Sequence, residues 1–141
     1  MKKILFFLIP FFFATRSTAQ NNTTPARVHK IIFQLMSDDT TVHTSLIKQL
    51  YNVLAAAPGT KIEVVCHGPG INLLMNDKTT VQNKIRDLKS KDVVFLACEN
   101  TLRDKNIPKE KIIAEAGFVQ SGIIQIVTRQ EEGWGYIKAG F

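Results

Sequence analysis

The sequence predicts an α/β protein built on a parallel β-sheet, and three observations lead to that prediction. Apolar runs rich in β-branched residues occur at residues 28–35, 61–66 and 92–97, and such runs are typical of buried parallel strands. Apolar residues at helical spacing fill the segment between the first two runs. Strands that alternate with helices form a parallel sheet with right-handed crossovers.

The first helix is expected over residues 40–57, after the first strand and a short polar loop. Asp39 or Thr40 can cap its start, and Pro58 and Gly59 end it. One helix face carries the apolar residues Val42, Leu46, Leu50, Val53, Leu54 and Ala57.

A sharp turn over residues 67–70 follows the second strand, and residues 71–75 can form a single helical turn. Thr79 or Thr80 is expected to cap the next helix, which buries Val81, Ile85 and Leu88. The third strand then ends next to Cys98.

The last third of the chain has weaker signals. Residues 99–111 are polar and are expected to be irregular, and residues 112–119 contain a fourth, weaker strand. Ser121 is expected to cap a last helix that Gly133 ends, before a fifth strand over residues 134–138.

The N-terminus predicts a signal peptide over residues 1–19. Lys2 and Lys3 precede an apolar run over residues 4–13, and small residues follow at 17–19. The run is too short to cross a bilayer as a helix, which needs about 20 residues. We therefore expect cleavage after Ala19 and a periplasmic or secreted protein; an uncleaved anchor is the alternative.

Behind the signal peptide, a flexible leader over residues 20–27 and one domain over residues 28–141 are expected. Removal of residues 1–19 takes away Lys2, Lys3 and Arg16 and no acid, which lowers the net charge from +6 to +3. Because this excess is mild and the lysines alternate with acids, the charge does not indicate a nucleic-acid partner. After cleavage no stable membrane insertion is expected.

Cys98 is the strongest candidate for chemistry. In open α/β sheets, sites lie beyond the carboxyl ends of the strands, and Cys98 leaves a buried strand there and enters a polar loop. A reactive thiolate would suit sulfur transfer or disulfide chemistry, although Glu99 would work against the negative charge. The alternative is a small buried residue that only packs.

His67 and Cys66 end the neighbouring strand. His67 could assist a Cys98 thiolate as a cation or proton carrier, or it could hydrogen-bond the backbone of its own turn. Cys66 could approach Cys98, because neighbouring strands lie about 4.8 Å apart, although their sulfurs could point to opposite faces. Export makes a disulfide chemically possible, but two cysteines are not a disulfide framework.

Several common sites have no signature in the sequence. Gly68-Pro69-Gly70 lacks the third glycine of a dinucleotide fingerprint, and no P-loop is present. The three histidines are scattered without ligand spacing, which argues against a dedicated metal site. No cofactor is therefore expected.

Four blocks of the chain resemble the DsrE/DsrF-like family, and the similarity is to its exported, single-domain branch. The blocks occur in the same order as in the family, and the resemblance covers most of the chain from Val28 onward. The blocks are Val64-Val65-Cys66-His67-Gly68-Pro69-Gly70-Ile71, Phe95-Leu96-Ala97-Cys98-Glu99-Asn100-Thr101-Leu102, Val119-Gln120-Ser121-Gly122 and Gln130-Glu131-Glu132-Gly133-Trp134-Gly135-Tyr136-Ile137.

The resemblance implies a three-layer α/β/α fold with a mostly parallel five-stranded sheet, homo-oligomers and a role near sulfur chemistry. Family members in sulfur relay carry sulfur on a cysteine as a persulfide, and Cys98 lies in the block that matches. Cys66 departs from the family pattern, so no family role is transferred to it.

Three functional hypotheses follow. The first is a sulfur carrier or sulfurtransferase-like protein that uses Cys98, with His67 and Asn100 as neighbours and a sulfur-donor or thiol protein as partner. The second is a non-catalytic oligomeric binding module. The third is a thiol–disulfide protein that uses Cys66 and Cys98. Trp134, Tyr136 and the apolar residues of 123–127 favour a homo-oligomer, because one small sheet covers little apolar surface.

Overall fold

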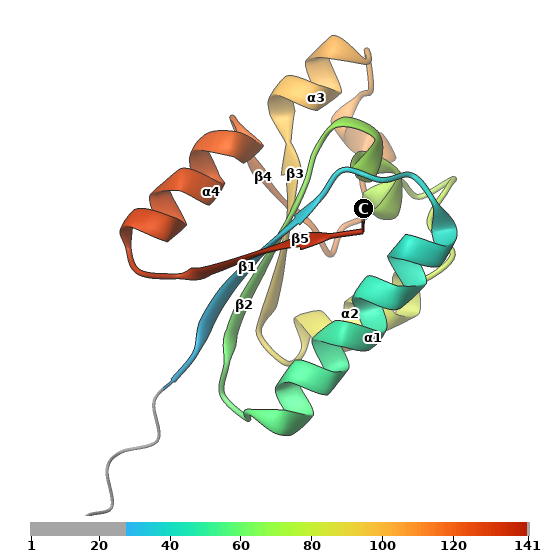
Figure 1. Cartoon of the computed structure of the whole chain (residues 1–141). Helices are drawn as coiled ribbons and strands as arrows, with labels where there is room; N and C mark the ends of the chain where they lie inside the picture. The colour runs from blue at the N-terminus through green and yellow to red at the C-terminus, as the bar shows by residue number, and fades with distance from the viewer. Residues whose placement is uncertain (1–27, 141) are drawn as a thin grey trace, which may run out of the picture.

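The computed structural model describes residues 28–140, as one α/β domain (Figure 1). The signal peptide and leader expected over residues 1–27 lie outside these residues. The strands are β1 (Lys30–Leu35), β2 (Lys61–Cys66), β3 (Val93–Cys98), β4 (Gly117–Val119) and β5 (Gly135–Ala139). The helices are α1 (Thr40–Ala56), α2 (Gln82–Lys89), α3 (Glu99–Asp104) and α4 (Gly122–Glu131), with short 3₁₀ helices η1 (Gly68–Leu74) and η2 (Lys109–Lys111).

The five strands form one sheet in the order β4-β3-β2-β1-β5, and every neighbouring pair is parallel. Helices α1 and α2 cover one face and α4 covers the other, so the domain has three layers (Figure 1). The predicted three-layer α/β/α class with a five-stranded sheet is therefore confirmed. Within residues 28–140, no helix has the length and apolar character needed to cross a membrane.

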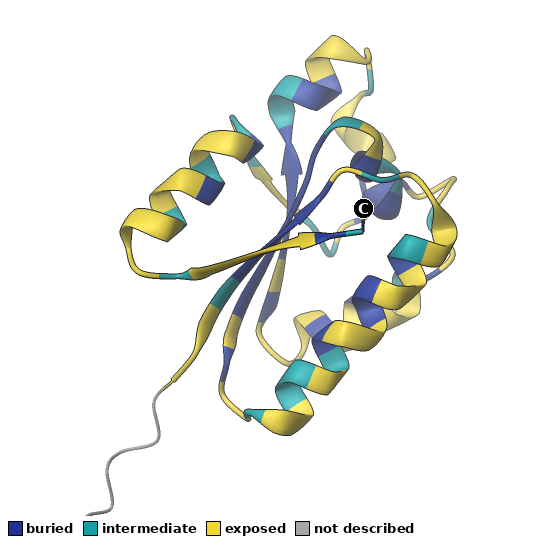
Figure 2. Ribbon diagram, in the orientation of Figure 1, coloured by how far each residue is buried: buried dark blue, intermediate teal, exposed yellow. Residues whose placement is uncertain are grey.

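The two faces of the sheet are covered unequally. The face under α1 and α2 carries the main core, which includes Phe33, Leu50 and Phe95. The face under α4 carries a small cluster of Ile32, Val65, Leu96 and Ile126, against which Val119 and Trp134 pack. Figure 2 shows α4 with exposed residues along most of its outer surface, and these include Ile123, Ile124 and Val127.

Three details differ from the sequence predictions. The segment expected to be irregular, residues 99–111, begins with helix α3. Two charged residues stabilise this helix by interacting favourably with its dipole: Glu99 in the first turn and Arg103 in the last turn. Neither threonine caps α2: Val81 holds the cap position, and the Thr79 hydroxyl accepts a hydrogen bond from its N–H. Strand β3 extends to include Cys98.

Candidate functional site

Cys98 lies at the carboxyl edge of the sheet, as the last residue of β3 and the cap residue of α3. Its partner in β4 is Val119, which packs on the α4 side of the sheet. The Cys98 sulfur accepts a hydrogen bond from the backbone N–H of Gly122, at 3.2 Å. Only 5% of Cys98 is exposed, so the sulfur is covered by α4.

Gly122 is the first residue of α4, and its missing side chain lets the helix approach the sheet. A Cβ at this position would lie 2.9 Å from Val65 Cγ1 and 3.4 Å from the Cβ atoms of both Cys98 and His67. The Ser121 hydroxyl accepts from Ile124 N and caps the helix, as predicted. These contacts direct the N-terminus of α4 at Cys98.

His67 follows β2, and its Cβ lies as close to Gly122 as that of Cys98 does. Its ring nitrogen Nε2 lies 2.7 Å from the Gln34 amide nitrogen, and the Tyr136 hydroxyl donates to the Gln34 carbonyl oxygen. The expectation that His67 bonds the backbone of its own turn is wrong, since the ring pairs with Gln34 of β1.

Burial lowers the pKa of His67, and an amide N–H that donates to Nε2 requires that nitrogen to be unprotonated. His67 is therefore a neutral ring beside Gly122, and the role of a cation next to Cys98 does not fit this arrangement. Gln34 and Tyr136 hold the ring in place from β1 and β5.

Asn100 lies in the first turn of α3 and faces α4. Its backbone N–H bonds Gln120 O at 3.1 Å, and its side-chain oxygen accepts from Arg103 at 2.8 Å. Asn100 also lines an open groove with residues that include Ser121 and Ile124. It thus lies beside the Cys98 edge but makes no hydrogen bond to the sulfur.

Cys66 lies on the opposite face of the sheet from Cys98. It pairs with Ala97 and packs in the main core with that residue, and burial raises the pKa of its thiol. Both cysteines are free. Because the sheet separates the two sulfurs, the thiol–disulfide hypothesis that joined Cys66 to Cys98 is wrong for this fold.

The charge of Glu99 is paired with a lysine. The Lys109 ammonium pairs with the Glu99 carboxylate and also lies over the Phe118 ring. Among the described residues no group of three His, Cys, Asp or Glu side chains is placed to hold a metal ion. The edge can therefore offer one thiol, backbone N–H groups and a neutral imidazole.

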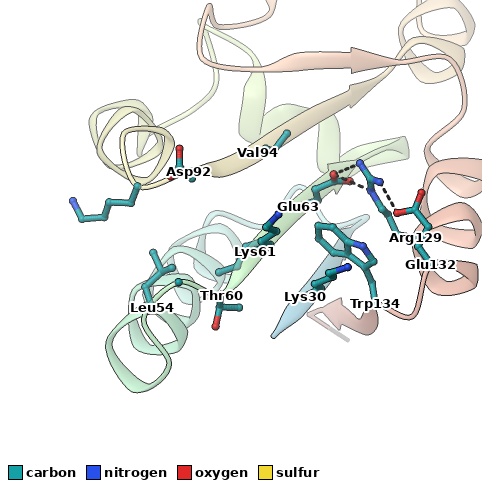
Figure 3. Close-up of a pocket in the computed structure, with 13 residues that line it drawn as sticks. Lys30, Leu54, Thr60, Lys61, Glu63, Asp92, Val94, Arg129, Glu132 and Trp134 are labelled. Carbon is teal, nitrogen blue, oxygen red and sulfur yellow. Dashed lines mark hydrogen bonds and ion pairs between the residues drawn. The ribbon is translucent and has the colours of Figure 1, made fainter. Parts of the chain in front are cut away.

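Sequence reasoning missed Gln34 and the role of Gly122. Gly122 lies in one of the four sequence blocks that resemble the family, and this position is the signal that could have pointed to its role. A cavity of about 670 Å³, which none of Cys98, His67 and Asn100 lines, occupies the other edge of the same face (Figure 3). The carboxyl edge with Cys98 is the better candidate for sulfur chemistry, because it presents a thiol and none of the residues that line the cavity is a cysteine.

The comparisons with known proteins agree with this fold. A solved protein of unknown function from Methanobacterium thermoautotrophicum, MTH1491, is 33% identical and superposes with a TM-score of 0.74, covering 78% of this chain and 98% of its own. BT1422, a conserved protein of unknown function from Bacteroides thetaiotaomicron, shares the fold at 19% identity with a TM-score of 0.63, covering 77% and 93% of the two chains.

A search of curated proteins finds no match. The model of the DsrE/DsrF-like family matches residues 29–139, which is the whole described domain apart from its first and last residues. The chain therefore belongs to the DsrE/DsrF-like family.

Proposed function

We propose that this protein is an exported sulfur carrier in which Cys98 accepts a sulfur atom as a persulfide. The observation that carries the proposal is the hydrogen bond from Gly122 N–H to the Cys98 sulfur at the start of α4. A helix N-terminus and a backbone N–H that donates to sulfur both favour negative charge on that sulfur. Family membership is the second support.

The proposed step is thiolate exchange with a donor persulfide. The Cys98 thiolate attacks the terminal sulfur of a partner's R–S–SH group, and a new S–S bond forms at Cys98. The S–S bond of the donor breaks, and the donor leaves as the thiolate R–S⁻. No oxidant is consumed, because the sulfane sulfur only changes its carrier.

The reaction requires the Cys98 sulfur to become accessible. Gly122 in the first turn of α4 lies against Cys98, and the open groove lined by Asn100 and Ser121 lies beside that turn, so a small outward movement of Gly122 would open a path. We propose that a partner with a donor thiol docks on this edge. Because His67 is a neutral ring, it would not assist the deprotonation of Cys98. His67 and Asn100 would instead contact the partner.

Intact-mass analysis tests the sulfur acceptor. After exposure to a low-molecular-weight persulfide, the wild-type protein should gain the mass of one sulfur, and reduction should remove it. Cys98→Ser should gain none, while Cys66→Ser, the matched control, should still gain one. Addition that persists in Cys98→Ser would contradict the assignment.

Export is a separate part of the proposal, supported by the charge and hydrophobic pattern of residues 1–19. Protein expressed in a bacterial host should begin at Gln20 when its N-terminus is measured by mass. Recovery of Lys2 and Lys3 in membrane-bound protein would favour the uncleaved anchor instead.

A non-catalytic oligomeric binding module is the second candidate. The 5% exposure of Cys98 favours it, as do the exposed Ile123, Ile124 and Val127 on α4. Under this alternative Cys98 only packs, and it should resist alkylation until the protein unfolds.

A further inference from the structure

The cavity of about 670 Å³ opens at the amino edge of the sheet, on the face that α4 covers. Its size lies within the range of small-molecule sites, about 300–1,000 Å³. Figure 3 shows Trp134, Lys30 and Lys61 in succession across the view, with Asp92 and Leu54 beyond them. It lies at the opposite end of the strands from Cys98, so it is not part of the site described above.

Two lysines of like charge stand side by side in this cavity. Lys30 and Lys61 begin neighbouring parallel strands and are partners in the register, so both side chains project from the same face of the sheet. The ion pairs among residues 28–140 include neither of them. Like charges directly across a strand pair are destabilising, which is a cost that a bound anion would remove.

Three other charged groups of the wall already pair with one another. Arg129 donates to the buried Glu63 carboxylate at 2.9 and 2.5 Å and to Glu132 at 2.7 Å, and these carboxylates raise its pKa. Gln125 adds a fourth hydrogen bond, to Glu63 at 2.8 Å. This network is a fixed wall. Lys91 also lines the cavity, but it pairs with Asp87 at 2.6 Å, so Lys30 and Lys61 are the lining lysines that remain available to a ligand.

The cavity also has an apolar side. The Arg129 guanidinium lies over the Trp134 ring, with its central carbon 4.9 Å from the ring centroid. Val94 of β3 is 43% exposed at the same opening, and Leu54 and Ile62 contribute further apolar lining. A ligand with charge alone would leave these surfaces without contact.

We propose that this cavity binds a small organic monoanion with a flat apolar body, such as an aryl carboxylate or aryl sulfonate. The Lys30 and Lys61 ammonium groups hold the anionic group, and Trp134 and Val94 contact the body. Asp92 also lines the cavity and offsets one of the two lysine charges, which favours a single negative charge over a multiply charged phosphate. The site is independent of the sulfur chemistry proposed for Cys98.

The test uses protein purified after expression of the full chain, with naphthalene-2-carboxylate as the probe. Trp134 is the sole tryptophan of the sequence, so its indole N–H gives one assignable NMR signal that reports directly on the cavity. That signal should shift on titration, and the uncharged naphthalene-2-methanol should bind at least about tenfold more weakly. A tenfold change corresponds to about 1.4 kcal/mol.

The paired variant Lys30→Gln/Lys61→Gln should weaken carboxylate binding about tenfold and leave binding of the alcohol unchanged. The matched control is Lys48→Gln/Lys84→Gln, which removes the same charge from exposed positions on α1 and α2 and should bind like wild type. Three results would overturn the proposal: no shift of the indole signal, equal binding of carboxylate and alcohol, or inorganic sulfate binding as tightly as the carboxylate.

Discussion

Gly122→Ala is the sharpest test of how the Cys98 site is built. The added Cβ would lie 2.9 Å from Val65 Cγ1 and 3.4 Å from the Cβ atoms of Cys98 and His67, so the first turn of α4 must move outward. Overpacking of this kind costs about 1–3 kcal/mol, and the better helix propensity of alanine returns up to about 1 kcal/mol. We expect a net loss of about 1–2 kcal/mol.

In a domain of this size that loss corresponds to a fall in melting temperature of roughly 4–10 °C. The same movement lengthens the bond from residue 122 N–H to the Cys98 sulfur, now 3.2 Å, and opens the path to it. Thermal melts and timed alkylation of the folded protein, read by peptide mass, measure the two effects together.

Gly135→Ala is the matched control. A Cβ there meets only Lys30 O, at 3.7 Å, which is an ordinary contact, so its stability and alkylation rate should stay close to those of wild type. If Gly122→Ala melted at the wild-type temperature with the wild-type alkylation rate, the close approach of α4 to the sheet would not be what covers Cys98, and the reasoning would fail.

Four further predictions follow from the same contacts. Arg129→Met should lower the free energy of unfolding by about 3–5 kcal/mol, because it leaves the Glu63 carboxylate buried without its cation; a second change, Glu63→Gln, should restore most of the loss in denaturant titrations. Burial lowers the pKa of His67 below its ordinary value of 6.5, so the unfolded chain takes up that proton first and stability falls as the pH drops below about 6.5; His67→Asn should flatten this part of the melting profile, and an unchanged profile would assign the loss to other groups. Cys98 should react with a small alkylating reagent before Cys66, which is fully buried in the core, and Cys98→Ser should keep the fold in thermal melts; the reverse order of modification would contradict both the burial and the functional assignment. The exposed apolar side chains of α4 should make the protein a homo-oligomer, and a monomer mass by light scattering at micromolar concentration would refute that expectation.

The first three strands could be predicted from the sequence because each is a compact, mostly apolar run of six residues. The expected second strand coincides with β2, which Gly59 precedes and the Gly68-Pro69-Gly70 turn follows. The first helix was expected within one residue of α1, since its apolar face repeats over four turns. Helix α3 was missed because six mostly polar residues are too few to show a helical period.

The candidate site could be predicted only in part, because its contacts depend on sheet order and register. Cys98 was placed correctly at a carboxyl edge, since that needs only the end of one strand. The hydrogen bonds from Gln34 to His67 and from Tyr136 to Gln34 join residues 33 and 102 positions apart, and the second exists only because β5 lies beside β1. Similarly, the opposite faces of Cys66 and Cys98 follow from one register, and a shift of one strand by one residue would place both sulfurs on the same face.

Helix α4 runs from the Cys98 site at the carboxyl edge of the sheet to the cavity at the amino edge, so a movement of α4 could couple the two sites. Its first residue contacts Cys98, and Arg129 near its end forms part of the cavity wall. These two residues are seven positions apart, which is about 10 Å along the helix axis. Glu63 fixes α4 from Gln125 to Arg129 through its hydrogen bonds with these two residues, so the shift caused by Gly122→Ala should be absorbed in the residues before Gln125. The Trp134 indole signal should then remain at its wild-type position in that variant, and a displaced signal would show that α4 moves as one rigid unit that links the thiol to the cavity.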